Sequence, residues 1–160
     1  MQRYLVTFLM LATLESMSQA IPNQTKSFAL RLTPRQDVKK TLLSFTKENH
    51  IKEGCILSAV GSVEQLNLWY ANPEAGIKLK GYFEVVSLTG TFSSGSAHLH
   101  MSVADSTGRT LGGHLLDDNN VYTTLEAIVG DLTDVQFDRE KDPTYGHPEL
   151  VIKPRTKNKE

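Results

Sequence analysis

The chain is built largely from short segments in which apolar and polar residues alternate, separated by clusters of turn-forming residues. Alternation is clear in Ser27–Leu32 and returns in segment after segment from Cys55 to Val129. It places one side of each segment against a core and the other toward solvent, as in strands of an antiparallel sheet. The turn residues at Ser93–Ser96 and Asp105–Gly108 predict hairpin connections between neighbouring strands.

One segment has helical spacing instead. Val38, Leu42 and Phe45 fall on one side of a helix. The preceding residues Thr33–Gln36 offer a capping threonine, a proline at the first helical position and a glutamine that completes a capping box. We expect this helix to end before Gly54, and the loops leave room for a second one. The predicted class is α+β (α/β sandwich-like): a single domain with a mainly antiparallel sheet and flanking helices.

Length, charge and cysteine content narrow the function. A chain of 160 residues suits one domain. Its net charge of −1 lacks the basic excess with which proteins displace counterions from duplex DNA, and this disfavours nucleic acid as a partner. The single cysteine, Cys55, excludes an internal disulfide and a cysteine-rich zinc site. A metal site would therefore have to use histidines and carboxylates.

The N-terminus has the layout of a secretory signal. Arg3 precedes an apolar stretch, Tyr4–Leu14, and Ser18 and Ala20 stand at the −3 and −1 positions of a cleavage site. We predict a signal peptide over residues 1–20 and a secreted protein; the stretch is too short for a stable membrane span. The alternative is an amphipathic helix or an anchor that stays attached. If the segment is not a signal, the protein is cytoplasmic or nuclear. In a eukaryotic secretory pathway, Asn23 would be a glycosylation site.

No internal repeat or linker divides the rest of the chain. We assign residues 21–26 to a short N-terminal segment and residues 27–152 to the folded domain. Residues 153–160 are polar and are expected to form a mobile tail.

Three of the five histidines lie close together in the sequence: His98, His100 and His114. On a strand, His98 and His100 face the same side, and the hairpin at Asp105–Gly108 can return His114 to the same end. Gly112-Gly113 would allow a bulge that aims the His114 ring.

Three imidazoles with an open fourth position form the arrangement of a catalytic or ligand-binding zinc site. Nickel, copper and iron remain alternatives. The ordinary alternative is two exposed strand histidines and an unrelated one in a turn. His50 and His147 have ordinary explanations, at a helix end and in a loop.

Other candidates carry a weaker signal. Asp117 and Glu126 can act as hydrogen-bond partners of the histidines or as proton acceptors, although turn and surface roles are commoner. Arg109 is the basic residue nearest the histidines in sequence and can contact an anion; a solvated hairpin residue is the alternative.

Several blocks of the sequence occur together in a known order. They are Phe83–Thr91, His98-Leu-His100, Asp105–Arg109, Gly112–Leu115 and Thr123–Glu126. In these blocks the chain resembles the plants-and-prokaryotes-conserved (PPC) domain, and the resemblance extends over about Ser27 to Leu132.

The resemblance implies a mainly antiparallel sheet with flanking helices, assembled as a homotrimer. It also implies that His98, His100 and His114 are metal ligands near a subunit boundary. Asp117–Asn120 departs from the family, whose members usually have a glycine and apolar residues there. The basic AT-hook segments of plant relatives do not occur in this sequence.

Three functions follow as hypotheses. The first is a homotrimeric module that binds a metal ion, with zinc as the expected cofactor, and leaves one position for water or an unknown small ligand. The second is a metal-dependent enzyme at the same site, with Glu126 or Asp117 as proton acceptor. The third is a DNA-binding or transcription-associated protein, which the charge and the missing AT-hook disfavour.

Overall fold

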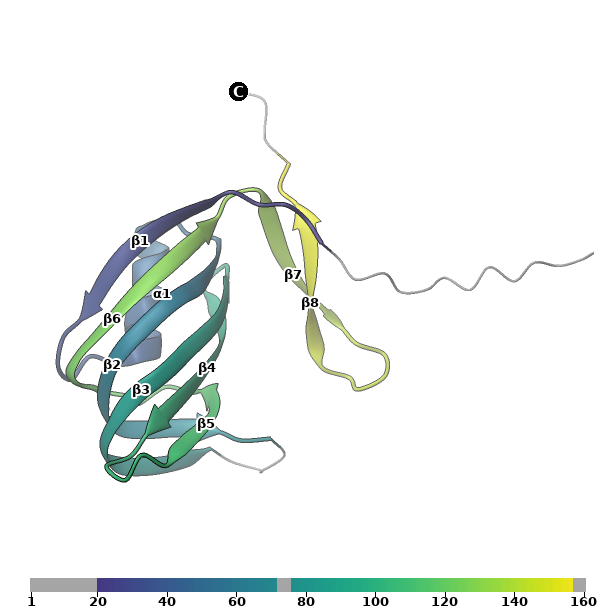
Figure 1. The fold of residues 1–160 in the computed structure, drawn as a ribbon. Coiled ribbons are helices and arrows are strands. Elements are labelled where there is room, and N and C mark those ends of the chain that lie inside the picture. The colour runs from purple at the N-terminus through teal and green to yellow at the C-terminus, as the bar shows by residue number, and fades with distance from the viewer. Residues whose placement is uncertain (1–19, 72–75, 157–160) are drawn as a thin grey trace, which may run out of the picture.

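The computed structural model describes residues 20–71 and 76–156, so the predicted signal peptide lies almost wholly outside the described residues. Figure 1 shows a large sheet, a helix against one of its faces and a separate hairpin. In chain order the elements are β1 (Thr25–Leu32), α1 (Val38–Glu48), β2 (Glu53–Trp69), β3 (Ile77–Ser93), β4 (Ser96–Ala104), β5 (Thr110–Leu115), β6 (Val121–Leu132), β7 (Val135–Lys141) and β8 (Pro148–Pro154).

The large sheet has the strand order β1-β6-β2-β3-β4-β5, and all of its pairs are antiparallel. The end of β2 also pairs with β5, where Leu68 lies opposite Leu115 and Trp69 opposite His114. The sheet therefore curls until β5 lies between β4 and the end of β2. This curl brings Trp69 of β2 beside His114, so a third strand adjoins the predicted site on β4 and β5.

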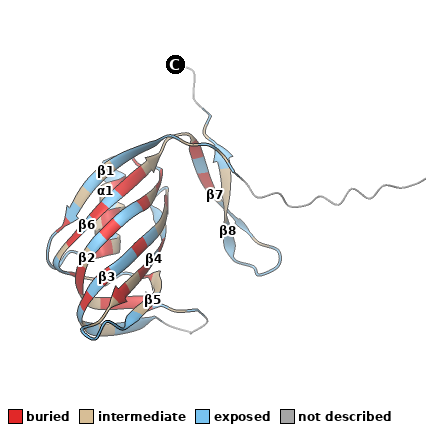
Figure 2. Cartoon of the chain, viewed as in Figure 1, coloured by how far each residue is buried: buried red, intermediate tan, exposed pale blue. Residues whose placement is uncertain are grey.

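The core lies between the helix and one face of the sheet. Helix α1 covers that face (Figure 1), and its Val38 and Leu42 are fully buried. Buried and exposed residues alternate along the strands (Figure 2), as the sequence pattern predicts. Each fully buried aliphatic side chain contributes about 1.5–3 kcal/mol relative to an exposed one.

The predicted class is correct in its mainly antiparallel sheet and single domain. The flanking helices are a correction, because the described residues contain one α-helix, and the fold is dominated by sheet rather than being an α/β sandwich. The connections between strands are mostly short, which leaves little chain for a second helix.

The helix also begins later than predicted. Asp37, not Thr33, caps it, because the Asp37 carboxylate accepts a hydrogen bond from the Lys40 amide at 2.8 Å. Thr33 does bond to the Gln36 side chain, but within a turn that precedes the helix. The backbone there is held by distant partners, including a β-bridge from Asp37 to Asn120, and this pairing delays the helix.

Strands β7 and β8 form a two-stranded sheet that the sequence analysis did not predict. Lys153 belongs to β8, and Arg155 forms an ion pair with the buried Glu53. The polar tail predicted from residue 153 is therefore wrong for its first residues, which are ordered by strand pairing and by this ion pair. No helix in the described part of the chain is both long and apolar enough to cross a membrane.

Candidate metal centre

Strand β4 presents two of the predicted ligands. His98 and His100 are exposed on its outer face, whereas Leu99 and Met101 are only 2% and 1% exposed on its inner face. The buried residues determine which way the strand faces, because turning it over would expose all of them at once.

Strand β5 supplies the third histidine. His114 lies directly opposite His100 in the β4–β5 register and opposite Trp69 of β2 on its other side. The connecting turn is held by Asp105, whose carboxylate accepts a hydrogen bond from the Thr107 amide at 2.9 Å. The predicted convergence of the three histidines is therefore confirmed.

Gly112 and Gly113 have a different role from the one expected. The β4–β5 register runs without a shift past both glycines, so there is no bulge. A Cβ atom at Gly113 would lie 2.6 Å from the Trp69 carbonyl oxygen, and one at Gly112 would lie 2.7 Å from the Ser102 hydroxyl. The glycines allow the strands to approach closely, and this approach brings His114 beside the other two histidines.

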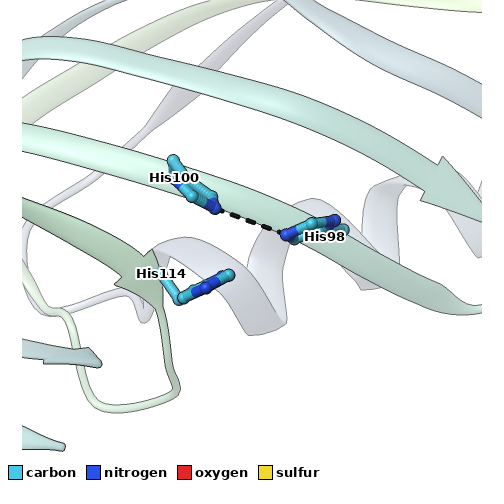
Figure 3. A group of neighbouring side chains, drawn as sticks. All are labelled: His98, His100 and His114. Carbon is cyan, nitrogen blue, oxygen red and sulfur yellow. Dashed lines mark hydrogen bonds between the residues drawn. The ribbon is translucent and has the colours of Figure 1, made fainter. Parts of the chain in front are cut away.

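The three rings converge on a common point (Figure 3). One ring nitrogen from each histidine lies within 4.8 Å of the other two, and the Nε2 atoms of His98 and His100 are 3.3 Å apart. In a tetrahedral zinc site with Zn–N distances of about 2.0–2.1 Å, two nitrogens are about 3.3–3.4 Å apart. The His98–His100 pair already has this spacing. His114 stacks on Trp69 with 5.0 Å between ring centroids, and a small shift of its ring would complete the set.

The local environment keeps two of the rings neutral. Partial burial, then the neighbouring His100 and Arg139, lower the pKa of His98 below 6.5, with Glu149 opposing. Partial burial, then His100 and His98, lower the pKa of His114. A neutral imidazole is the form that binds metal, so the site is prepared for ligation at neutral pH.

The donor set fits the predicted metal. Among the described residues, no carboxylate or thiolate joins the three-histidine group. Imidazole suits zinc, copper, iron and nickel alike, and three protein ligands leave a position for water or another molecule. The histidines can therefore hold a metal ion, and the donors by themselves do not select which one.

A cleft of about 510 Å³ opens beside this group. Its walls include His98, His114 and Trp69 on the large sheet, and Arg139 and His147 from the β7–β8 hairpin. A ligand at the metal's open position would therefore meet side chains from both sheets.

The predicted carboxylate partners lie elsewhere. Glu126 lies on β6 opposite Arg31 of β1, on another part of the sheet. The Asp117 carboxylate approaches the Lys39 and Lys40 ammonium groups at 3.7 and 3.9 Å. Sequence proximity is misleading for Asp117 because the chain turns toward α1 directly after His114.

Arg109 is also separated from the histidines. It lies in the turn between β4 and β5, at the other end of β5 from His114, and its Nε is 3.5 Å from the Asp105 carboxylate. The arginine that lines the cleft is Arg139.

Sequence reasoning missed Arg139, Glu149 and Trp69, and it dismissed His147. The available signal was weak: Val135, Phe137 and Arg139 alternate as on a strand, but nothing local relates that strand to the histidines.

Asn23, the predicted glycosylation residue, has a structural contact. Its amide oxygen accepts a hydrogen bond from the Asp134 backbone N–H at 2.9 Å, and the Gln24 amide donates to the Asp134 carboxylate at 2.8 Å. These bonds hold the N-terminal segment against the connection between β6 and β7.

Comparison with known proteins gives a consistent family. Residues 19–133 match the model of the Plants and Prokaryotes Conserved (PCC) domain, the PPC domain that the sequence resembles. A bifunctional protein GlmU from a Synechococcus strain is 38% identical over 133 residues, covering 83% of this chain and 21% of that protein. The chain thus spans about a fifth of the length of such curated relatives.

Solved structures agree on the fold. A hypothetical protein from Salmonella enterica superposes with a TM-score of 0.83 at 37% identity, covering 86% of this chain and all of that one. A metal-containing protein from Archaeoglobus fulgidus has a TM-score of 0.70 at 24% identity, covering 84% of this chain and 99% of that chain. At this identity the second likeness concerns the fold alone.

Proposed function

Given that this chain belongs to the Plants and Prokaryotes Conserved (PCC) domain family, we propose that it is a module that binds one divalent metal ion, with zinc as the expected ion. His98, His100 and His114 are the ligands, and the fourth position receives water or a small ligand. The family match includes all three histidines. The Archaeoglobus fulgidus protein, described as metal-containing, is in keeping with this function.

The observation that carries the proposal is the convergence of three imidazole nitrogens within 4.8 Å of one another. Three basic groups at this spacing repel one another when protonated, and no carboxylate from the described part of the chain joins the group to compensate. An arrangement that disfavours its own protonation is well explained if a cation takes the place of the protons.

When bound, the metal would supply a Lewis-acidic position beside the cleft. The protein's contribution is orientation: β4 holds His98 and His100 in register, and Trp69 supports the His114 ring. The β7–β8 hairpin forms the opposite wall of the cleft beside that position.

We further propose that the module is a homotrimer, as the family resemblance implies. The face of the large sheet opposite α1 has exposed apolar residues on β2, β3 and β6, a feature that commonly marks an interface. They are Leu57, Val60, Tyr82, Val86, Tyr122 and Ile128, exposed between 38% and 65%. Sedimentation equilibrium tests this: a mass of three chains is expected, and Val60→Lys with Val86→Lys should reduce it to one.

Export remains part of the proposal, on the N-terminal layout of basic, apolar and small residues. N-terminal sequencing of protein recovered from its native host should begin near Ile21. A chain that begins at Met1 would overturn secretion and return the protein to the cytoplasm or nucleus.

Metal content measured on purified protein tests the central proposal. We expect about one ion per chain in the wild type and almost none in a His98→Ala/His100→Ala double variant. His50→Ala is the matched control, because His50 lies past the end of α1 and outside the three-histidine group.

Fluorescence offers a second readout. Trp69 is the single tryptophan of the chain and stacks on His114. Its emission should therefore change on titration with zinc in the wild type and in His50→Ala, but not in the double variant. A wild type that takes up no metal would overturn the function.

A further inference from the structure

The β7–β8 hairpin forms the wall of the cleft that faces the histidines. Its base is fixed to the large sheet, because Val135 and Phe137 are buried and the Ser93 hydroxyl donates to the Phe137 carbonyl at 3.3 Å. Arg155, directly after β8, adds the ion pair with buried Glu53. The hairpin is therefore held in a defined position relative to the metal centre.

Near its free end this hairpin presents a cation to the cleft. Arg139 lines the cleft and is exposed, and its Nη1 donates a long hydrogen bond of 3.4 Å to the Pro148 carbonyl. Among the described residues, no carboxylate lies within ion-pair distance of Arg139, although Glu149 lines the same cleft. The guanidinium therefore keeps donors for a ligand. Arg139 and His98 line the same cleft, from the hairpin and from the large sheet.

The rest of the lining indicates what kind of anion would fit. Trp69, Ala97 and Pro148 provide apolar surface, and the volume of about 510 Å³ exceeds what a simple inorganic ion needs. Glu149 lines the same wall and repels a ligand with two negative charges more strongly than a ligand with one. These features match a small organic monocarboxylate with an apolar part.

We infer that the cleft binds such a carboxylate between the metal's open position and Arg139, with the apolar part of the ligand against Trp69. Arg139 is the specificity-determining residue, because its planar group of donors matches a carboxylate in two-point contact. This inference rests on the proposed metal-binding function and assigns a ligand class to it. Glu149 sets the preference for one negative charge over two.

Calorimetric titration of benzoate into zinc-loaded protein tests the inference, with metal content measured on each sample. Arg139→Gln should lower benzoate affinity by about tenfold or more, since it removes a charge-assisted hydrogen bond. Glu149→Gln should raise affinity, and more for inorganic phosphate than for benzoate. Lys141→Gln removes the same charge from the same strand outside the cleft lining and should stay within about twofold of wild type.

The cobalt-substituted protein gives a second readout, because benzoate at the open position should shift the visible absorption of the ion. The inference alone is overturned if metal content is normal but Arg139→Gln binds benzoate as the wild type does, or if the wild type binds none. If the wild type takes up no metal, the proposed function is overturned and the inference with it.

Discussion

Strand β4 has two faces of opposite character. On the inner face, Leu99, Met101 and Val103 are at most 2% exposed and form part of the core beneath α1. On the outer face, His98 and His100 are exposed and meet one another rather than a core. Both sets alternate along one backbone, so a single strand holds the fold together and displays a binding group.

The difference between these faces has a physical consequence. Burying the inner residues stabilises the fold through apolar area and close packing. Gathering three imidazoles on the outer face adds little burial and disfavours their protonation. Stability and metal binding should therefore respond to different substitutions on the same strand.

The largest difference in unfolding free energy is expected between Leu99→Ala and His100→Ala. Leu99→Ala leaves a cavity in the core and should lower the free energy of unfolding by about 2–5 kcal/mol. His100→Ala should change it by no more than about 0.5 kcal/mol, because the side chain is exposed, yet should abolish tight metal binding. Urea denaturation with a chelator present measures the first effect, and metal content the second. Equal losses of stability would contradict the division between the faces.

Gly113→Ala should affect both stability and metal binding. The added methyl would meet the Trp69 backbone oxygen, which cannot rotate away, so the strands must separate. We expect a loss of about 1–3 kcal/mol in unfolding free energy and weaker metal binding. Gly112→Ala is the control, since its nearest atom is the Ser102 hydroxyl, which can turn aside, and it should cost less in thermal unfolding.

Lowering the pH should affect the histidines of the outer face before it affects the apolar residues of the inner face. The pKa values of His98 and His114 are lowered in the folded protein from 6.5, so the unfolded chain binds more protons below that pH. Their contribution to stability is unchanged well above pH 6.5 and becomes unfavourable as pH falls through it. Zinc affinity should also fall as the pH is lowered, by at most about tenfold per histidine between pH 6.5 and 5.5.

Calorimetric titration of zinc at several pH values, together with thermal unfolding of the metal-free protein, measures both effects. Affinity that stays constant over the whole acidic range in which the protein remains folded would indicate that these histidines are not the ligands.

The smallest effect is expected at Arg109, which lies in the β4–β5 turn away from both faces. Its exposed ion pair with Asp105 is worth at most about 1 kcal/mol. Arg109→Ala should therefore leave metal and benzoate binding unchanged in calorimetry. A loss of benzoate affinity comparable with that of Arg139→Gln would reverse the assignment of the two arginines.

Much of the fold could be predicted because its determinants are local. Alternation of apolar residues specified most strands, and the turn at Asp105–Gly108 specified the return of β5 that brings His114 to His100. The start of α1 could not be predicted in the same way. Two local caps compete there, Thr33 and Asp37, and distant pairing with Asn120 decides between them.

The candidate site could likewise be predicted only in part. His98 and His100 share a face by strand geometry, and one hairpin adds His114. The partners named from sequence proximity lie elsewhere: Asp117, Glu126 and Arg109. The chain turns between these residues and the histidines, so closeness in sequence does not place their side chains at the site.

The sequence by itself determined the antiparallel sheet, the family and the three histidines, since these depend on alternation and on one short hairpin. Only the tertiary structure decided what faces the histidines. Strands β7 and β8 follow β6 in the chain, and their position depends on buried contacts of Phe137 and Glu53 with residues far away in sequence. Contacts of that range leave no periodic signal, so Arg139 and His147 become part of the site only when the chain has folded.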